Sequence, residues 1–546
     1  MERRASVGGS KAARPVPPGL RSAVDLSAAL GWLLGAVAVV WIGGAIVAQS
    51  VEFVVRHVTI DDSYYYLNTA WNARHLGWVT FDGHNPTNGV QFLWYWLLYA
   101  GSFLCETKES FLRLALWACV ALGAASVVSA WRIGVLVRGR VGGWLAAALV
   151  AHAVVDVAFL RALENTLHLL VCLGAVELYL RFLRDVAAEP ARASRRLPWL
   201  FFLLALNAWS RLDAGAISAV VALHAVWASR CAGPAAGRGR ALLTAGLVCA
   251  IAGFVQFYGY WRMGGSVVPV SGLWKTGGVP LADLPASLLE WWGRPLAQVL
   301  PLERWLPAVW IHASAVLLAG AVLVGAIRIV RRGEHAPFKV GAGVLIAALA
   351  FHSVCMANLV DAVALRRGYW YQAPYVALSA LLVTMAIVPS GPGPQLRWLA
   401  RGRAIAAIGV AFWLLWSARI AQLDFVQRRL DRDNFHGVRY ELARWIDANL
   451  APGARLASFN SGELGYFSGR SMTNLDGLIN SYSYLRYRQA GGSVAEYLVA
   501  EGIDYFVDYA THDGIAEVTE LVHSVSLPKV GPIEVRRVLR NRERGK

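Results

Sequence analysis

Long apolar segments alternate with short polar loops over the first 422 residues of the chain. The apolar segments cover residues 27–49, 111–137, 141–158, 163–181, 198–210, 213–229, 241–261, 307–330, 340–360, 371–389 and 404–420. An apolar run of about 20 residues is long enough to cross a bilayer as a helix. The pattern therefore predicts an all-α polytopic membrane domain with about 11 transmembrane helices over residues 27–422. The short segments 198–210 and 213–229 form either two tilted helices or one broken helix.

The apolar run at residues 90–105 allows two topologies. If it crosses the bilayer, the basic residues at 138–140 and 181–196 lie outside the cell. If it lies in the membrane interface or re-enters, every basic cluster lies in the cytoplasm. Basic loops are typically cytoplasmic, which favours the second topology. Residues 1–26 then form a cytoplasmic tail, and the first outer loop covers residues 50–110.

The last part of the chain, residues 423–546, has a different pattern. Residues 436–449 have helical periodicity, and Pro and Gly follow them. Residues 455–459 and 503–508 have the composition of short strands, and a helix-like stretch at 493–501 precedes the second of these. This pattern predicts a small soluble α/β domain, which the favoured topology places outside the cytoplasm.

The composition supports a membrane protein and excludes several other classes. Hydrophobic residues make up 57% of the chain and charged residues 16%, against about 25% in soluble globular proteins. The net charge is +17, yet residues 423–546 hold 16 basic and 16 acidic residues, so the whole excess lies in residues 1–422. This distribution indicates topology and contact with lipid head groups, not binding of nucleic acid. The six cysteines nearly all lie in or beside apolar runs without metal-ligand spacing, which argues against zinc or disulfide frameworks.

An acidic pair, Asp61 and Asp62, begins an aromatic stretch with helical character about ten residues beyond the first apolar segment. In a structural interpretation, Asp61 caps this helix and Asp62 interacts favourably with the helix dipole. In a functional interpretation, a carboxylate at the membrane boundary acts as a general base or binds a sugar. The two interpretations are compatible. A tight loop follows, and it contains Asn85 and Asn88 as candidate substrate ligands.

The other predicted outer loops also carry charged and polar residues. These candidates are Glu164, Arg211, Asp213, Lys275, Arg366, Arg367 and Tyr369. Each of them alone has a simpler explanation, because a charge can anchor a helix end, and Arg211 and Asp213 can neutralise each other. Ionisable residues near a membrane are nonetheless typical of functional sites. Several outer loops that bring such residues to one face predict a shared polar cavity.

Seven short motifs in this order resemble a known family. They are DDSYYY at 61–66, FDGHNPTNG at 81–89, LENTL at 163–167, SRLD at 210–213, PVSGLWK at 269–275, NSGELGYF at 460–467 and NLDGLIN at 474–480. Together they resemble the GT-C superfamily of membrane glycosyltransferases, which includes protein O-mannosyltransferases, the lipid A aminoarabinose transferase and mycobacterial arabinofuranosyltransferases. The last two motifs resemble the C-terminal region of uncharacterised bacterial members.

The resemblance implies an inverting transferase in the cytoplasmic membrane. Such an enzyme moves a hexose or pentose from a polyprenyl-phosphate donor to a glycan, lipid or protein acceptor on the outer side, and it needs no metal or other cofactor. The family's catalytic carboxylate corresponds to Asp61, with Asp62 and Glu164 in support. The donor phosphate would bind Lys275 or the arginines at 366 and 367. One departure is that residues 85–96 contain no basic residue where relatives often carry one.

Two other functions stay open at this point. A transporter or lipid flippase would carry its ionisable residues near the middle of the bilayer and would contain two related halves. Here these residues gather at one interface, and the sequence contains no visible repeat. The second alternative is a scaffold without catalytic activity whose soluble domain binds glycan. For the transferase, we expect the C-terminal domain to assist acceptor binding or stability, although Asp476 lies in a glycine-flanked loop that can reach the cavity.

Overall fold

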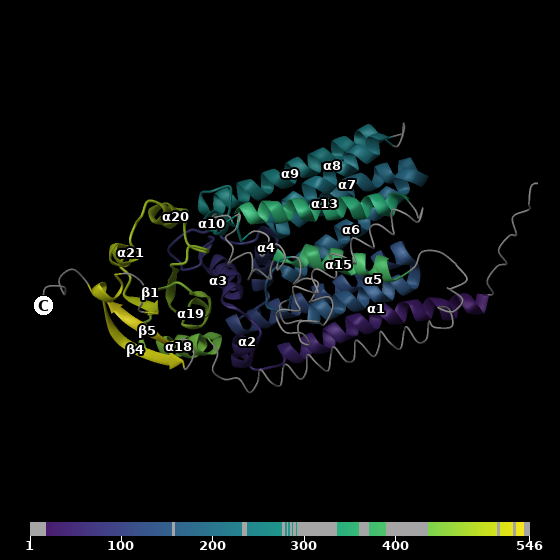
Figure 1. Cartoon of the computed structure of the whole chain (residues 1–546). Helices are drawn as coiled ribbons and strands as arrows, with labels where there is room; N and C mark the ends of the chain where they lie inside the picture. Colours follow the sequence, from purple (N-terminus) through teal and green to yellow (C-terminus); the bar gives the residue numbers. More distant parts are fainter. Residues whose placement is uncertain are drawn as a thin grey trace, which may run out of the picture.

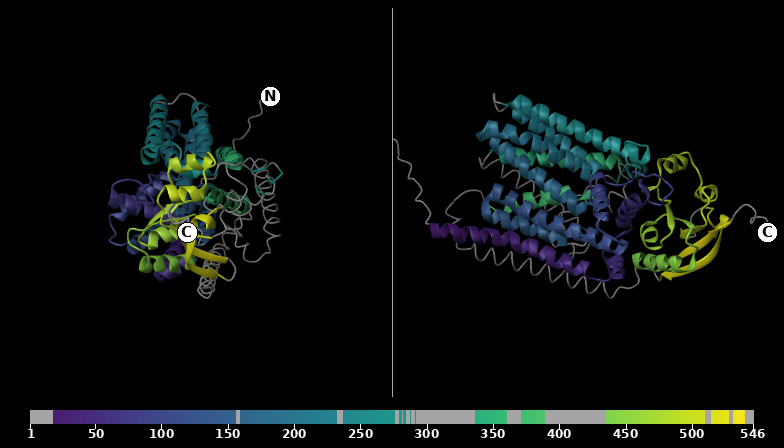
Figure 2. Two further views of the ribbon diagram at one scale, coloured as in Figure 1. Left: turned by 90° about the vertical axis from the view of Figure 1, so that its left-hand side faces the viewer. Right: turned by 180° about the vertical axis from the view of Figure 1, so that it is seen from behind.

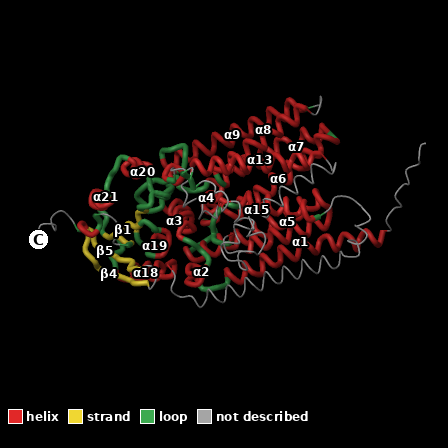
Figure 3. Tube along the Cα trace, in the orientation of Figure 1, coloured by secondary structure: helices red, strands yellow, loops and turns green. Residues whose placement is uncertain are grey.

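The computed structural model describes most of the chain. The described residues are 18–155, 159–231, 237–275, 279–280, 282–283, 287, 291, 336–359, 371–388, 435–509, 514–527 and 531–539. Long helices lie side by side in a bundle, and a smaller domain that contains all the described strands lies at one end of it (Figures 1 and 3). Short helices and loops fill the region between them, as a view from behind also shows (Figure 2).

The bundle is formed by helices that match the predicted apolar segments. They are α1 (Pro18–Val47), α5 (Lys108–Val155), α6 (Asn165–Ala188), α7 (Pro190–Ser210), α8 (Gly215–Cys231), α9 (Arg238–Gly264), α13 (Ala336–Leu359) and α15 (Ala373–Ile387). Helix α1 begins at Pro18, nine residues before its predicted apolar segment. The backbone of α5 leaves the helical conformation at Arg138 and Gly139, so α5 contains both the segment 111–137 and the segment 141–158.

Five helices in the described part of the chain are long and apolar enough to cross a membrane, and α1 with α2 (Val51–His57) forms a further pair bent by 113°. The predicted number of about 11 spans is therefore not confirmed, and the segments 307–330 and 404–420 lie outside the described residues. Helices α7 and α8 are separate and contact each other across a short 3₁₀ turn, η2 (Leu212–Ala214). The sequence was compatible with two helices or with one broken helix over residues 198–229, and the structure contains two helices there.

Three short helices lie between the bundle and the C-terminal domain (Figure 1). They are α3 (Asp61–Leu76), α4 (Phe92–Ser102) and α10 (Val270–Trp274). Helix α4 occupies most of the run 90–105, whose topology was ambiguous. Its 11 residues rise about 16 Å, roughly half the thickness of a bilayer's hydrocarbon core. The placement of this segment in the membrane interface stays a prediction.

The C-terminal domain contains a five-stranded mixed sheet with helices around it. Its elements are α18 (Phe435–Asn449), β1 (Arg455–Ser458), α19 (Gly462–Phe467), β2 (Ser471–Asn474), α20 (Tyr482–Gln489), α21 (Val494–Ala500), β3 (Tyr505–Asp508), β4 (Thr519–Leu527) and β5 (Gly531–Val538). The strand order is β2-β1-β3-β5-β4, in which β1 runs parallel to β2 and β3, and β5 runs antiparallel to β3 and β4. The predicted helices α18 and α21 and strands β1 and β3 are present, whereas β2, β4, β5, α19 and α20 were not predicted.

The C-terminal domain packs directly on the short helices and on the end of the bundle. One continuous hydrophobic cluster includes bundle residues such as Phe111 and domain residues such as Leu464 and Tyr466. The Lys108 amine at the start of α5 donates a hydrogen bond of 2.9 Å to the carbonyl of Tyr466. Arg56 of α2 forms an ion pair with Glu441 of α18. The two parts therefore share a core and polar contacts.

Candidate functional site

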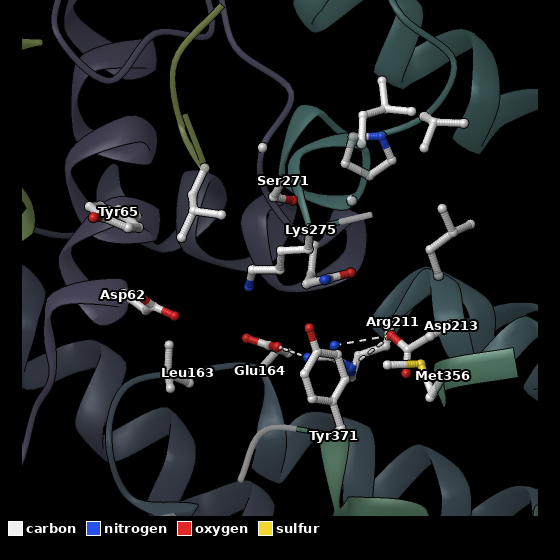
Figure 4. Close-up of a pocket in the computed structure, with 18 of the residues that line it drawn as sticks. Asp62, Tyr65, Leu163, Glu164, Arg211, Asp213, Ser271, Lys275, Met356 and Tyr371 are labelled. Carbon is white, nitrogen blue, oxygen red and sulfur yellow. Dashed lines mark hydrogen bonds and ion pairs between the residues drawn. The ribbon is translucent and has the colours of Figure 1, made fainter. Parts of the chain in front are cut away.

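A cavity of about 420 Å³ lies where the bundle, the short helices and the C-terminal domain meet (Figure 4). Its charged and tyrosine side chains come from five parts of the chain that are far apart in sequence. The charged and tyrosine residues that line it are Asp62, Tyr65, Tyr66, Glu164, Arg211, Asp213, Lys275 and Tyr371. Leu478 of the C-terminal domain completes one wall. Of the residues expected to share one cavity, Asp62, Glu164, Arg211, Asp213 and Lys275 therefore line the same one.

Asp62 is the second residue of α3, and its carboxylate points into the cavity (Figure 4). Burial raises its pKa, the nearby Lys275 amine lowers it, and the charge of Asp61 raises it, so that the pKa of Asp62 is raised on balance. A carboxylate with a raised pKa is a stronger base than an exposed one, while its partial exposure leaves it accessible to a substrate.

A buried ion-pair network forms the opposite wall. Arg211 precedes η2 and forms ion pairs with Glu164 and, at 3.0 Å, with Asp213. The side chains of Arg211 and Glu164 are each only 3% exposed. The guanidinium also lies 4.3 Å from the ring centre of Tyr371, and Asp213 lies 3.1 Å from His352 of α13. The network fixes a cation at the cavity surface (Figure 4).

Lys275 follows α10 and supplies the second cation. Figure 4 shows its amine directed toward Asp62 and Glu164. Burial lowers the pKa of Lys275, but Tyr371 and Asp62 raise it more, so that the pKa lies above its ordinary value. Lys275 therefore stays charged at neutral pH. The cavity combines two cations with carboxylates, which suits a substrate with both an anionic group and hydroxyl groups.

Asp61, the predicted catalytic carboxylate, lies elsewhere. It does not line the cavity, is 8% exposed, and points to the C-terminal domain, where its Oδ1 accepts hydrogen bonds from the backbone N–H groups of Gly462 (2.7 Å) and Glu463 (3.3 Å). Burial raises the pKa of Asp61 well above its usual range, and the neighbouring Glu463 raises it further. Of the two adjacent acids, the structure places Asp62 at the cavity.

The two asparagines proposed as substrate ligands do not line the cavity either. The Asn85 side chain donates a hydrogen bond to Asp82 within its own loop. Asn88 is buried, donates to the carbonyls of Ser266 (2.8 Å) and Val268 (3.3 Å) and accepts from the N–H of Val270 (2.9 Å). Both residues hold loops together, and Asn88 fixes the start of α10, which carries Lys275 at its end. The predicted ligands Arg366, Arg367 and Tyr369 lie outside the described residues.

Several residues of the site were not predicted. Tyr65 and Tyr66 follow Asp62 by three and four positions, a spacing that places them on nearly the same helix face and was a usable signal. Tyr371 and Leu478 have no local signal, because only the tertiary fold brings them to the cavity. No cluster of three metal-ligating side chains is found in the described part of the chain.

Comparisons with known proteins identify the fold. Residues 428–539 match a family model described only as a domain of unknown function, DUF8728. No curated protein matches the chain. Among solved structures, ArnT from Cupriavidus metallidurans in the apo state has a TM-score of 0.55 at 14% identity over 95% of this chain and 98% of that chain. Its complex with undecaprenyl phosphate has a TM-score of 0.52 at 14% identity, covering 94% of this chain and 98% of that chain.

An oligosaccharyltransferase from Archaeoglobus fulgidus, in complex with Zn and sulfate, is also similar. Its TM-score is 0.52 at 13% identity, covering 92% of this chain and 72% of that chain. ArnT and this oligosaccharyltransferase are GT-C glycosyltransferases. The GT-C fold that the sequence motifs indicated is therefore confirmed.

Proposed function

We propose that the protein is an inverting glycosyltransferase that moves a sugar from a polyprenyl-phosphate donor to a hydroxyl group of an acceptor. The observation that carries this proposal is the cavity itself, where an accessible carboxylate, Asp62, faces two cations, Lys275 and Arg211. Support comes from the GT-C fold and from the undecaprenyl phosphate bound by the similar ArnT. The long apolar helices beside the cavity would surround the lipid chain of such a donor.

In this mechanism, Asp62 takes the proton of the acceptor hydroxyl. The oxygen attacks the anomeric carbon from the side opposite the phosphate, so that a new glycosidic bond forms while the bond between the anomeric carbon and the phosphate oxygen breaks. The electron pair of the broken bond leaves with the polyprenyl phosphate. Fixed cations stabilise charge that develops on a leaving group, and Lys275 and Arg211 are in place for this role. The displacement inverts the anomeric centre.

Glu164 and Asp213 have supporting roles in this proposal. Both carboxylates hold the Arg211 guanidinium in one orientation through their ion pairs. A guanidinium held in place before the reaction needs no reorganisation when charge develops, which is the condition for effective electrostatic catalysis. The same two acids reduce the net positive charge of the cavity, so that Lys275 becomes the principal cation for the donor phosphate.

The test is a transfer assay with the purified full chain in lipid nanodiscs. A panel of undecaprenyl-phosphate-linked hexoses and pentoses, radiolabelled in the sugar, is incubated with bacterial envelope fractions as acceptor. We expect label transfer from at least one donor. Replacement of a general base typically lowers the rate about 10²–10⁴-fold. Asp62→Asn should show such a loss in kcat, with binding of undecaprenyl phosphate preserved.

Asp61→Asn is the matched control because it makes the same chemical change one residue away. We expect it to keep turnover within about tenfold of wild type, since its side-chain oxygen can still accept the two backbone hydrogen bonds. If Asp61→Asn is inactive and Asp62→Asn is active, Asp61 is the base. If both variants are fully active, or if no donor is consumed by the wild type, the proposed glycosyl transfer is wrong.

A further inference from the structure

Helix α3 presents its first turns to two different partners. Asp62 and Tyr66, which are one helical turn apart, face the cavity. Asp61 and Tyr65, also one turn apart, both form hydrogen bonds with the C-terminal domain, and Tyr65 also lines the cavity. Successive residues of a helix are separated by about 100° around its axis. Contacts that hold Asp61 and Tyr65 therefore also restrict the direction in which Asp62 points.

The contact at Asp61 is close and involves backbone atoms. Its carboxylate binds the N–H groups of Gly462 and Glu463, and its own carbonyl oxygen lies against the α-carbon of Gly462. A Cβ atom at position 462 would lie 2.1 Å from that carbonyl oxygen and 2.8 Å from Oδ1 of Asp61. Gly462 has an ordinary helical backbone, so that glycine is required here by the neighbour and not by conformation.

The contact at Tyr65 adds a second fixed point. Its hydroxyl donates a hydrogen bond of 2.7 Å to Asp476 and accepts one of 3.2 Å from Asn474, at the end of β2. Asn474 also donates to the hydroxyl of Ser461 (2.9 Å), directly before Gly462. The two contacts with α3 are thus linked to each other inside the C-terminal domain.

The segment that holds Asp61 is itself anchored to the sheet. Arg439 of α18 is fully buried, donates to the carbonyl of Asn460 and forms an ion pair of 3.1 Å with Asp508 at the end of β3. Glu463, whose backbone N–H binds Asp61, is also fully buried, and its carboxylate oxygen Oε1 lies 2.6 Å from Nδ1 of His436. The backbone amides that bind Asp61 are therefore part of a rigid support.

We propose that the C-terminal domain is a positioning element of the catalytic centre, and that Asp61 is the positioning residue through which it directs Asp62 into the cavity. This inference rests on the proposed function, in which Asp62 acts as the base. A catalytic group that is misplaced by about 1 Å can lose about 10²-fold in rate. The domain thus affects turnover without touching the reacting atoms.

The experiment compares Gly462→Ala with Gly453→Ala in the full chain. Gly453 lies in the same domain, and an added Cβ there meets no atom within 4 Å. We expect Gly462→Ala to lower kcat about 10–100-fold while the Kd for undecaprenyl phosphate, the binding probe, stays within about twofold of wild type. Gly453→Ala should match wild type in both. Hydrogen–deuterium exchange should show faster exchange in α3 for Gly462→Ala only.

Asp61→Ala and Asp61→Asn form a second pair in case Gly462→Ala does not fold. The alanine variant loses the oxygen that accepts both backbone hydrogen bonds, whereas the asparagine variant keeps an oxygen that can accept both. We expect Asp61→Ala to lower kcat and to increase exchange in α3, and Asp61→Asn to restore both. Unchanged kcat and unchanged α3 exchange in Gly462→Ala and Asp61→Ala would overturn the inference. An inactive wild type would overturn the proposed function instead, while the exchange data would still decide whether the domain holds α3.

Discussion

The buried network around Arg211 gives a prediction about stability that does not depend on the substrate. Arg211→Met keeps a side chain of similar length but removes the charge. It leaves Glu164 and Asp213 without the cation with which both of them are paired, at a site where Glu164 is only 3% exposed. Removal of one partner from a buried ion pair typically costs about 3–5 kcal/mol. Loss of the contact with the Tyr371 ring adds about 1 kcal/mol.

A second substitution separates charge from packing. In Arg211→Met/Glu164→Gln, the carboxylate that loses its cation is also neutralised, whereas Asp213 keeps His352 as a partner. We expect Arg211→Met to lower the Tm of the protein in nanodiscs by about 5 °C or more, and the double variant to recover at least half of that loss. Intrinsic tryptophan fluorescence during heating measures both, since the chain contains 23 tryptophans. If the losses in Tm of the single variants Arg211→Met and Glu164→Gln simply add in the double variant, the network is not held by charge. A double variant that is less stable than Arg211→Met would refute the reasoning in the same way.

Two further predictions concern the second cation and a buried acid of the C-terminal domain. Lys275→Ala should weaken binding of undecaprenyl phosphate by about tenfold or more, because hydrogen bonds to charged groups contribute about 1.5–3 kcal/mol. Arg486→Ala, at an exposed arginine of α20, is the control, and an unchanged Kd in Lys275→Ala would remove Lys275 from the phosphate site. Burial raises the pKa of Asp476 to about 7 from an ordinary value of 3.8. Between about pH 4 and pH 7, Asp476 therefore keeps its proton in the folded state but loses it in the unfolded state. The free energy of unfolding falls over this range by at most about 1.4 kcal/mol for each pH unit. Asp476→Asn should consequently show a smaller fall in Tm between pH 4.5 and pH 7 than wild type, and an equal fall would contradict the buried-acid interpretation.

The sequence was sufficient to predict the helical bundle, because a membrane-spanning segment is a local property. Each such segment must be apolar over its own length, and every predicted segment within the described residues corresponds to a helix or to one part of α5. The small sheet was predicted only in part. Strand β2 has four residues, of which only Met472 is hydrophobic, so that no alternation is visible in the sequence. Its place in the sheet depends on pairing with β1.

The sequence predicted many of the residues that line the candidate site, but it predicted less well which role each residue has. Glu164, Arg211, Asp213 and Lys275 were identified because charged residues in loops near a membrane are few and costly. The choice between Asp61 and Asp62 was a different problem. Helical geometry shows that the two side chains diverge, but it does not show which of them faces the cavity. That depends on Gly462, 401 residues away from Asp61.

The position of the C-terminal domain follows from the same physical reasoning. The cavity is built from short helices and loops at the end of a bundle, and each of these segments loses conformational entropy when it is fixed. Catalytic groups need supporting contacts that hold them within a fraction of an ångström. The domain supplies such contacts to α3 through Asp61 and Tyr65. It also contacts α10, because the ring of Trp274, the residue before Lys275, stacks on Tyr484. The domain thus contacts both elements that carry the proposed base and the principal cation, and these contacts help to set the distance between the two groups.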